Sequence, residues 1–359
     1  MSLLDHAIWW HVYPLGATGA PLRDHAPDQV KHRLSRLEPW LDHAVELGCS
    51  GVLLGPVFAS TSHGYDTLDH FRLDPRLGDD ADWDDFVEQA HGRGLAIMLD
   101  GVFNHVGAGH ELVEKARSGE ADDGGGSMIR LVDGRPADWE GHGDLAELDH
   151  ADPRVADLVE SIMLHWLRRG ADGWRLDVAY AVPSEFWARV LGRVRAEFPD
   201  AMFLGEVIHG DYAEIAAAGT LDSVTQYELW KAIWSSLADR NMWELAAALE
   251  RHDAFSTQTM MQTFVGNHDV TRIATRVGDE GAALAAVVLL TLPGMPSIYY
   301  GDEQGFRGDK GEGFATDDAL RPALPDSPAD LAPEGWWLHR LYQALISVRR
   351  RNPGSPAAR

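Results

Sequence analysis

Carboxylate side chains follow four short apolar runs of this 359-residue chain. The acids are Asp100, Asp177, Glu206 and Asp269. Burying an acid beside an apolar run costs free energy unless the acid is paired or has a chemical task. Two adjacent carboxyl groups can break an acetal, because one protonates the leaving oxygen while the other stands beside the developing positive charge. The residue types therefore favour chemistry at a glycosidic bond.

Arg175 precedes Asp177 by two residues on a predicted strand. Side chains two apart on a strand point to the same face, so we expect the guanidinium to hold Asp177 ionised and oriented. The acid that protonates the leaving oxygen must keep its proton near neutral pH. Its surroundings should therefore raise its pKa relative to that of the nucleophile.

Short β-branched or aliphatic runs alternate along the chain with longer amphipathic stretches. The predicted strands are residues 8–12, 51–54, 95–99, 173–176, 202–204, 223–225, 259–264 and 297–299. The predicted helices are residues 30–47, 83–91, 155–168, 184–198, 228–250, 280–291 and 336–350. Such alternation indicates parallel βαβ units, and eight strands favour an α/β fold of the closed (β/α)₈ or TIM-barrel type. A barrel gathers the carboxyl ends of its strands on one rim, where the acids would meet.

One interval does not follow this alternation of strands and helices. Residues 105–148 include the glycine-rich run at 122–126 and show no convincing long element. We interpret them as a short inserted subdomain after the third strand. The barrel is then formed by residues 1–104 and 149–351, and residues 352–359 form a C-terminal tail.

The composition limits the classes of molecule that the protein is expected to bind. The chain has 56 acidic and 31 basic residues, a formal net charge of −25, which disfavours binding to nucleic acid or to anionic membranes. The single cysteine, Cys49, allows no intrachain disulfide and is predicted to be a small buried residue. The first residues lack the pattern of a secretion signal, and the apolar run 282–292 is about half the length of a membrane span. A cytoplasmic protein acting on a neutral substrate is expected.

Four segments, in order, resemble the signature regions of the α-amylase family, glycoside hydrolase family 13. They are residues 100–105, residues 173–177, Glu206 and residues 267–269. The segments 51–58, 63–66, 145–149 and 294–303 resemble secondary motifs of that family, so the resemblance spans roughly residues 8 to 350. It implies a retaining mechanism in which Asp177 is the nucleophile, Glu206 the acid/base and Asp269 a third acid that binds sugar hydroxyls.

The resemblance also assigns the residues around these acids. Tyr65, Asp66, His105, Arg175 and His268 would line the subsite of the attacked glucose. Arg321 would be a substrate-side arginine, and Asp100 and Asn104 would be structural residues of the site. Other interpretations stay open, because the two histidines could be core residues with satisfied hydrogen bonds. Tyr65 and Asp66 could likewise only shape a loop.

No metal cofactor is expected. Many α-amylases bind calcium through the asparagine of the first motif and a Lys-His pair just after the nucleophile. Asn104 is present, but residues 179–181 read Ala-Tyr-Ala where that pair would stand. The scattered histidines also lack the HExxH spacing of a zinc site.

The sequence of residues 173–179 most resembles that of the neopullulanase and cyclomaltodextrinase branch of the family. That branch carries an N-terminal domain and most of the family ends in a β-sandwich, but this chain has residues for neither. We therefore expect an open cleft and hydrolysis of α-1,4-linked maltooligosaccharides, with α-1,6-linked and cyclic glucans as alternatives. A transglycosylase or isomerase would use the same acids. An inactive sugar-binding barrel is a third hypothesis, and the sequence does not predict an oligomeric state.

Overall fold

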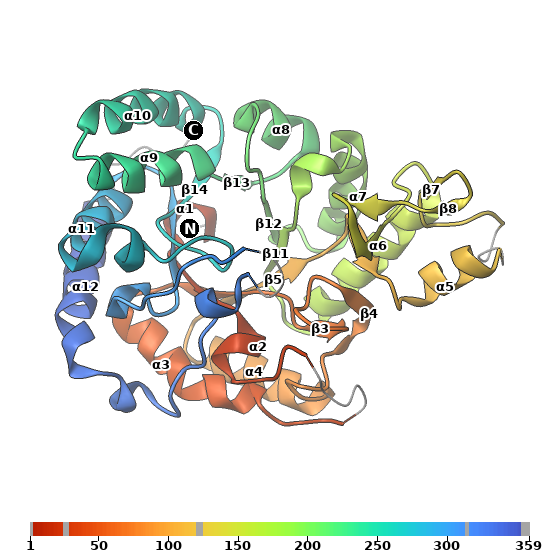
Figure 1. Cartoon of the computed structure of the whole chain (residues 1–359), viewed down its shortest axis with the longest axis horizontal. Coiled ribbons are helices and arrows are strands. Elements are labelled where there is room, and N and C mark those ends of the chain that lie inside the picture. Colours follow the sequence, from red (N-terminus) through yellow and green to blue (C-terminus); the bar gives the residue numbers. More distant parts are fainter. Residues whose placement is uncertain (1–2, 24–28, 120–124, 313–315, 353–359) are drawn as a thin grey trace.

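The computed structural model describes residues 3–23, 29–119, 125–312 and 316–352, and its centre is a closed barrel of parallel strands (Figure 1). In order around the barrel these are β1 (Trp9–Val12), β2 (Gly51–Leu54), β5 (Ala96–Gly101), β11 (Gly173–Leu176), β12 (Met202–Gly205), β13 (Ser223–Thr225), β14 (Met260–Phe264) and β15 (Met295–Tyr299). The last strand pairs with the first, with Trp9 opposite Ser297. The predicted TIM barrel and its eight strands are confirmed.

Helices cover the outside of the barrel (Figure 1). They are α3 (Glu38–Leu47), α4 (Asp80–Gly92), α6 (Pro153–Arg168), α7 (Ser184–Glu197), α8 (Tyr212–Gly219), α9 (Tyr227–Ala238), α10 (Met242–Ser256), α11 (Ile273–Thr291) and α12 (Trp336–Arg351). Five predicted helices coincide with α4, α6, α7, α11 and α12. None of the helices in the described ranges is long and apolar enough to cross a membrane.

Two helical predictions were wrong in detail, and one helix was not predicted. The sequence predicts one helix over 228–250. The structure has two, because the helical conformation is interrupted at Arg240, whose φ is 52°, and Asn241 then forms the N-cap of α10. The stretch 30–47 becomes helical only at the 3₁₀ turn η1 (Leu34–Leu37), which leads into α3. Helix α8 was not predicted, because its alanine-rich sequence lacks a clear amphipathic period.

The inserted subdomain contains more regular structure than expected. Its elements are β6 (His105–Gly107), α5 (Glu111–Ser118), β7 (Leu131–Val132), β8 (Arg135–Pro136), β9 (Asp138–Trp139) and β10 (His142–Glu147). Strands β6, β10 and β9 form a small antiparallel sheet, and the insertion projects from one side of the barrel (Figure 1). Residues 122–124 of the glycine-rich run and residues 353–359 of the predicted tail lie outside the described residues.

A hairpin of β3 (Phe58–Ser60) and β4 (Thr67–Leu73) presents the loop that contains Tyr65 and Asp66. Its base is fixed by a buried ion pair, in which Arg76 Nη2 lies 2.6 Å from Asp74 Oδ2. The same nitrogen donates a hydrogen bond of 2.6 Å to Ser60 Oγ. The ion pair therefore anchors a loop that faces the barrel rim.

The interior of the barrel is apolar at its amino-terminal end. Trp9 packs there with Met98, Met202 and Met295, and Trp10 stacks on Trp40 in the layer between strands and helices. Trp9 and Trp10 are therefore core residues. Cys49 is also buried, as predicted, and burial raises the pKa of its thiol, which makes it unreactive.

Candidate active site

Four of the predicted site residues lie on neighbouring strands of the same barrel rim. Arg175 is the register partner of Asp100 on β5, and Leu176 is the partner of Gly205 on β12. Asp177 directly follows β11 and Glu206 directly follows β12, so the two acids are lateral neighbours. Parallel strands lie about 4.8 Å apart, which sets the spacing of such neighbours.

Arg175 contacts all three acids of this rim. Its Nη1 lies 2.6 Å from Asp100 Oδ1 and 3.3 Å from Asp177 Oδ1, and its Nη2 lies 2.7 Å from Glu206 Oε1. All four side chains are buried. Since Asp177 and Glu206 contact the two terminal nitrogens of one guanidinium, their carboxyl groups lie side by side.

The backbone after Asp177 is strained, and the strained residue donates a hydrogen bond to Glu206. Val178 has φ 41° and ψ 42°, a left-handed conformation that is rare for a β-branched residue and costs about 1–3 kcal/mol. This turn leads into η2 (Ala179–Ala181), and it directs the Val178 N–H to Glu206 Oε2 at 3.0 Å. A strained residue beside two buried acids is typical of a functional site.

Burial opposes the ionisation of Asp177 in the ligand-free site. Together with the charge of Glu206, it raises the pKa of Asp177 well above the usual range for an aspartate. Arg175 opposes this rise, and its contact with Asp177 is the longest of its three contacts with acids. A positive charge developing on a sugar beside Asp177 would favour the carboxylate again.

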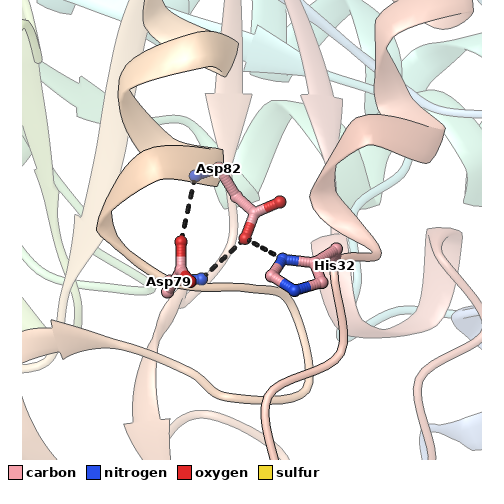
Figure 2. Close-up of side chains that lie close together, drawn as sticks. All are labelled: His32, Asp79 and Asp82. Atoms are coloured by element: carbon pink, nitrogen blue, oxygen red, sulfur yellow. Dashed lines mark hydrogen bonds and ion pairs between the residues drawn. The ribbon is translucent and has the colours of Figure 1, made fainter.

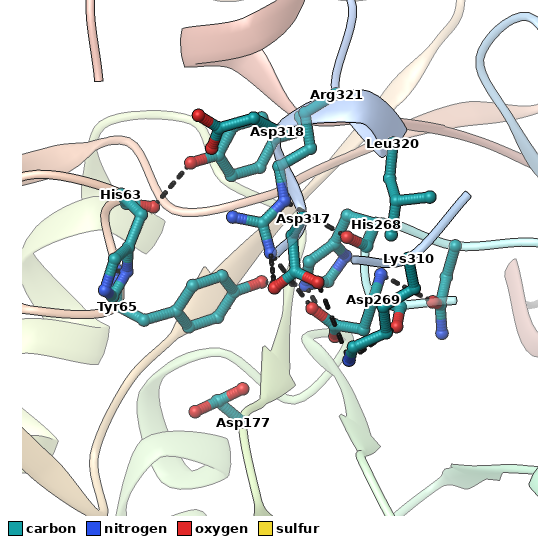
Figure 3. Close-up of polar contacts among 12 residues, drawn as sticks. His63, Tyr65, Asp177, His268, Asp269, Lys310, Asp317, Asp318, Leu320 and Arg321 are labelled. Carbon is teal, nitrogen blue, oxygen red and sulfur yellow. Dashed lines mark hydrogen bonds and ion pairs between the residues drawn. The ribbon is translucent and has the colours of Figure 1, made fainter. Parts of the chain in front are cut away.

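Asp269, which follows β14, is held by His268 and Arg321 (Figure 3). Its Oδ2 lies 3.0 Å from His268 Nε2, and its Oδ1 accepts a hydrogen bond of 3.1 Å from Arg321 Nη2. Burial opposes its ionisation, but the interactions with His268 and Arg321 outweigh this and lower the pKa of Asp269. Asp269 is therefore a carboxylate that can accept hydrogen bonds from sugar hydroxyls.

Arg321 is held in place by residues from distant parts of the chain. Gly16, in the short helix α2 (Pro14–Ala17), packs under it so closely that a Cβ there would lie 2.3 Å from the Arg321 carbonyl oxygen. The ring of Tyr13 lies 4.5 Å from the guanidinium carbon. The buried Arg272 donates a hydrogen bond of 2.8 Å to the carbonyl of Leu320. The loop after β15 is thus fixed over the rim.

Two residues near Asp269 were not predicted from the sequence. Lys310 Nζ donates to the Asp269 carbonyl oxygen at 2.8 Å, and Asp317 Oδ2 accepts from Arg321 Nη2 at 3.2 Å (Figure 3). The four-residue spacing between Asp317 and Arg321 was the available signal for the second of these. Both add charge to the side of the site formed by the loop after β15.

Tyr65 lies between the acids and His268. Its hydroxyl donates to Asp100 Oδ2 at 3.0 Å and contacts His268 Nε2, and its ring stacks on the His268 ring at 5.3 Å. Burial raises the pKa of Tyr65, which therefore keeps its proton. One face of Tyr65 is covered by His268, so only the other face is left for a sugar ring.

Asp66 and His105 differ in their surroundings. The Asp66 carboxylate accepts hydrogen bonds from the Ser62 backbone at 3.1 Å and from the Ser62 hydroxyl at 2.6 Å, contacts that favour the loop-shaping interpretation. His105 stacks on Trp139 of β9 at 6.1 Å, and burial lowers its pKa to about 4. His105 is therefore neutral and can both donate and accept a hydrogen bond.

The described residues offer one close group of histidine and carboxylate ligand atoms, His32, Asp79 and Asp82 (Figure 2). Its two acids form the capping box of α4, in which Asp79 Oδ1 accepts from the Asp82 N–H at 3.4 Å and Asp82 Oδ2 accepts from the Asp79 N–H at 2.8 Å. Helix capping accounts for the two acids of the cluster without an ion.

Calcium independence stays a prediction. The Asn104 amide lies 3.2 Å from His105 Nδ1, and residues 179–181 form the turn η2 without the Lys-His pair. We expect activity on maltotriose to be unchanged after treatment with excess EDTA and desalting. Loss of activity that returns with Ca²⁺, but not with Mg²⁺, would contradict this prediction.

The barrel, with four acids, two arginines and two histidines at its carboxyl end, defines a protein of the barrel glycosidase class. The profile of the alpha-amylase catalytic domain matches residues 37–126 and 140–332. The chain therefore belongs to the alpha-amylase family.

The chain is similar to several curated members of this family. The chain is 31% identical over 350 residues to neopullulanase 2 of Thermoactinomyces vulgaris, covering 90% of this chain and 56% of the relative. It is 31% identical over 333 residues to the maltogenic alpha-amylase of Bacillus acidopullulyticus, covering 87% and 55%. The chain thus spans about half the length of the curated relatives it matches.

A solved structure agrees over nearly the whole chain. The cyclic alpha-maltosyl-(1→6)-maltose hydrolase of Arthrobacter globiformis, in complex with maltose, superposes with a TM-score of 0.84 at 26% identity. The match covers 99% of this chain and 85% of that protein.

Proposed function

We propose that the protein is a retaining α-glucoside hydrolase. The observation that carries the proposal is the placement of Asp177 and Glu206 as register neighbours that share the guanidinium of Arg175. Retention requires two carboxyl groups about 5–5.5 Å apart, a spacing that suits side chains on adjacent parallel strands. Inverting enzymes need a wider gap for a water molecule.

In the first step Asp177 attacks the anomeric carbon while Glu206 protonates the glycosidic oxygen, and the C1–O bond breaks. In the second step Glu206 removes a proton from water, and this water displaces Asp177. The ionised Asp269, with His268 and Arg321, would bind hydroxyls of the attacked sugar. Binding that strengthens as the ring flattens lowers the barrier.

We propose short or cyclic α-1,4-linked maltooligosaccharides as substrates, with α-1,6 linkages as an alternative. Support comes from the names of similar proteins, which include neopullulanase, cyclomaltodextrinase and a hydrolase of cyclic maltosyl-maltose. A cytoplasmic location is proposed on similar grounds, since two Bacillus subtilis relatives are named intracellular maltogenic amylases. Product profiles on cyclodextrin, pullulan and maltotriose test the substrate class.

The stereochemical course tests the mechanism. Proton NMR of early maltotriose hydrolysis should show the α-anomer of the new reducing end first, followed by slow mutarotation, because two displacements restore the original configuration. If the β-anomer appeared first, the double displacement would be excluded. Failure to release glucose or maltose from any of the three glucans would count against hydrolysis itself.

A further inference from the structure

The hydroxyl of Tyr227 is one of the donors to Glu206. Glu206 Oε1 accepts from Arg175 Nη2 at 2.7 Å and from the Tyr227 hydroxyl at 3.1 Å. Its Oε2 accepts from the Val178 N–H at 3.0 Å. With two donors already at Oε1, the proton used in acid catalysis has to reside on Oε2. Tyr227 and Arg175 together select the oxygen that carries it.

Asn267 determines the direction of this hydrogen bond. Its Oδ1 accepts the backbone N–H of Asp269 at 2.9 Å, which orients the amide so that Nδ2 faces Tyr227 and donates to its oxygen at 2.8 Å. The Tyr227 oxygen therefore acts as an acceptor for Asn267, and its single proton is directed to Glu206. The chain of hydrogen bonds runs from β14 to the carboxyl group on β12.

The ring of Tyr227 has little freedom to move. Tyr227 is the first residue of α9 and is 8% exposed, and its ring packs on Phe264 at 4.9 Å and on Trp230 at 5.8 Å. Val270 completes this small apolar cluster. Burial raises the pKa of Tyr227 well above that of a free tyrosine, so the hydroxyl stays a donor across the neutral range.

We propose that Tyr227, oriented by Asn267, is a positioning residue for Glu206, and that it keeps Oε1 occupied so that Oε2 presents the proton to the leaving sugar oxygen. The inference rests on the proposed hydrolase function. As Oε2 gives its proton to the glycosidic oxygen and the C1–O bond breaks, Glu206 becomes a carboxylate. The hydrogen bond from Tyr227 strengthens as this charge develops, which lowers the barrier without any contact between Tyr227 and the sugar.

Several other groups act on the charge of Glu206. They are Arg175 and Asp177 from β11, Asp100 from β5, and Tyr180 from η2. All of them remain when only the Tyr227 hydroxyl is removed. Since Tyr227 donates to the carboxylate, its loss favours the protonated form of Glu206.

Replacement of Tyr227 by phenylalanine keeps the packed ring and removes the donor. For Tyr227→Phe we expect kcat on maltotriose to fall about ten- to hundredfold, with a small change in KM. The alkaline limb of the pH profile should move to higher pH. The rate on 4-nitrophenyl α-maltoside should fall much less, because its leaving group needs little protonation. Tyr342→Phe is the matched control, since Tyr342 is a buried tyrosine of α12 whose hydroxyl has no partner among the described residues.

The inference is overturned if Tyr227→Phe, with a wild-type unfolding midpoint, keeps the maltotriose rate and the alkaline limb. It is also overturned if both substrates lose rate equally while the limb stays in place, because that result indicates a structural role. Should Tyr227→Phe not fold, Asn267→Leu must show the same selective loss on maltotriose. A wild-type protein that cleaves neither substrate refutes the proposed function, whereas an active wild type with an unaffected variant refutes this inference alone.

Discussion

Asp177→Asn should lower the rate of maltotriose hydrolysis by about 10⁴-fold or more, while leaving the unfolding midpoint close to that of the wild type. The amide has nearly the same shape but cannot form the covalent bond to the anomeric carbon. It also removes a buried acid whose pKa is already raised by burial and by Glu206, so folding loses little. Steady-state kinetics and thermal unfolding of the purified variant measure both effects.

A smaller side chain makes this test specific for a nucleophile. In Asp177→Gly, azide can enter the space left by the carboxylate, and Glu206 can still protonate the leaving oxygen. One displacement by azide should then give a β-glycosyl azide. Asp138→Asn, an exposed acid of β9, is the control and should keep the wild-type rate. If Asp177→Asn retained the wild-type rate, the assignment of the nucleophile would be wrong.

Glu206→Gln should separate substrates by their leaving groups. Loss of the general acid removes about 10²–10⁴-fold from hydrolysis of maltotriose, where the leaving sugar must be protonated. On 4-nitrophenyl α-maltoside the first step should remain fast, and the glycosyl-enzyme should accumulate because water is no longer activated. Stopped-flow detection of a burst of nitrophenol and mass spectrometry of the trapped intermediate measure this.

Azide again gives a stereochemical readout. In Glu206→Gln, azide should attack the intermediate on Asp177 and form an α-glycosyl azide, the anomer opposite to that expected from Asp177→Gly. Equal losses on both substrates, with no burst, would mean that Glu206 is not the acid/base.

The placement of the acids could be predicted because a barrel converts chain order into spatial order. Asp100 lies near the end of β5, Asp177 and Glu206 directly follow β11 and β12, and parallel strands deliver such residues to one rim. The period of two also predicted that Arg175 and Asp177 share a face. These predictions need only the repeat of the strands, which local hydrophobic patterns reveal.

Contacts set by long-range packing could not be predicted in this way. Tyr227 lies two residues beyond β13, and nothing local shows that its hydroxyl lies 3.1 Å from Glu206. The raised pKa of Asp177 results from its burial and from the charge of Glu206, and local sequence shows neither of these. The break between α9 and α10 likewise depends on a single left-handed residue, Arg240.

The packing of Gly16 against the carbonyl of Arg321 joins the first turn after β1 to the loop after β15. These segments become neighbours only when the last strand pairs with the first and the barrel is sealed. A ribosome-bound chain that ends before β15 lacks both Arg321 and the loop that carries it, although Asp177, Glu206 and Asp269 have already been synthesised. The part of the site that Arg321 contributes therefore forms only when the last strand completes the ring.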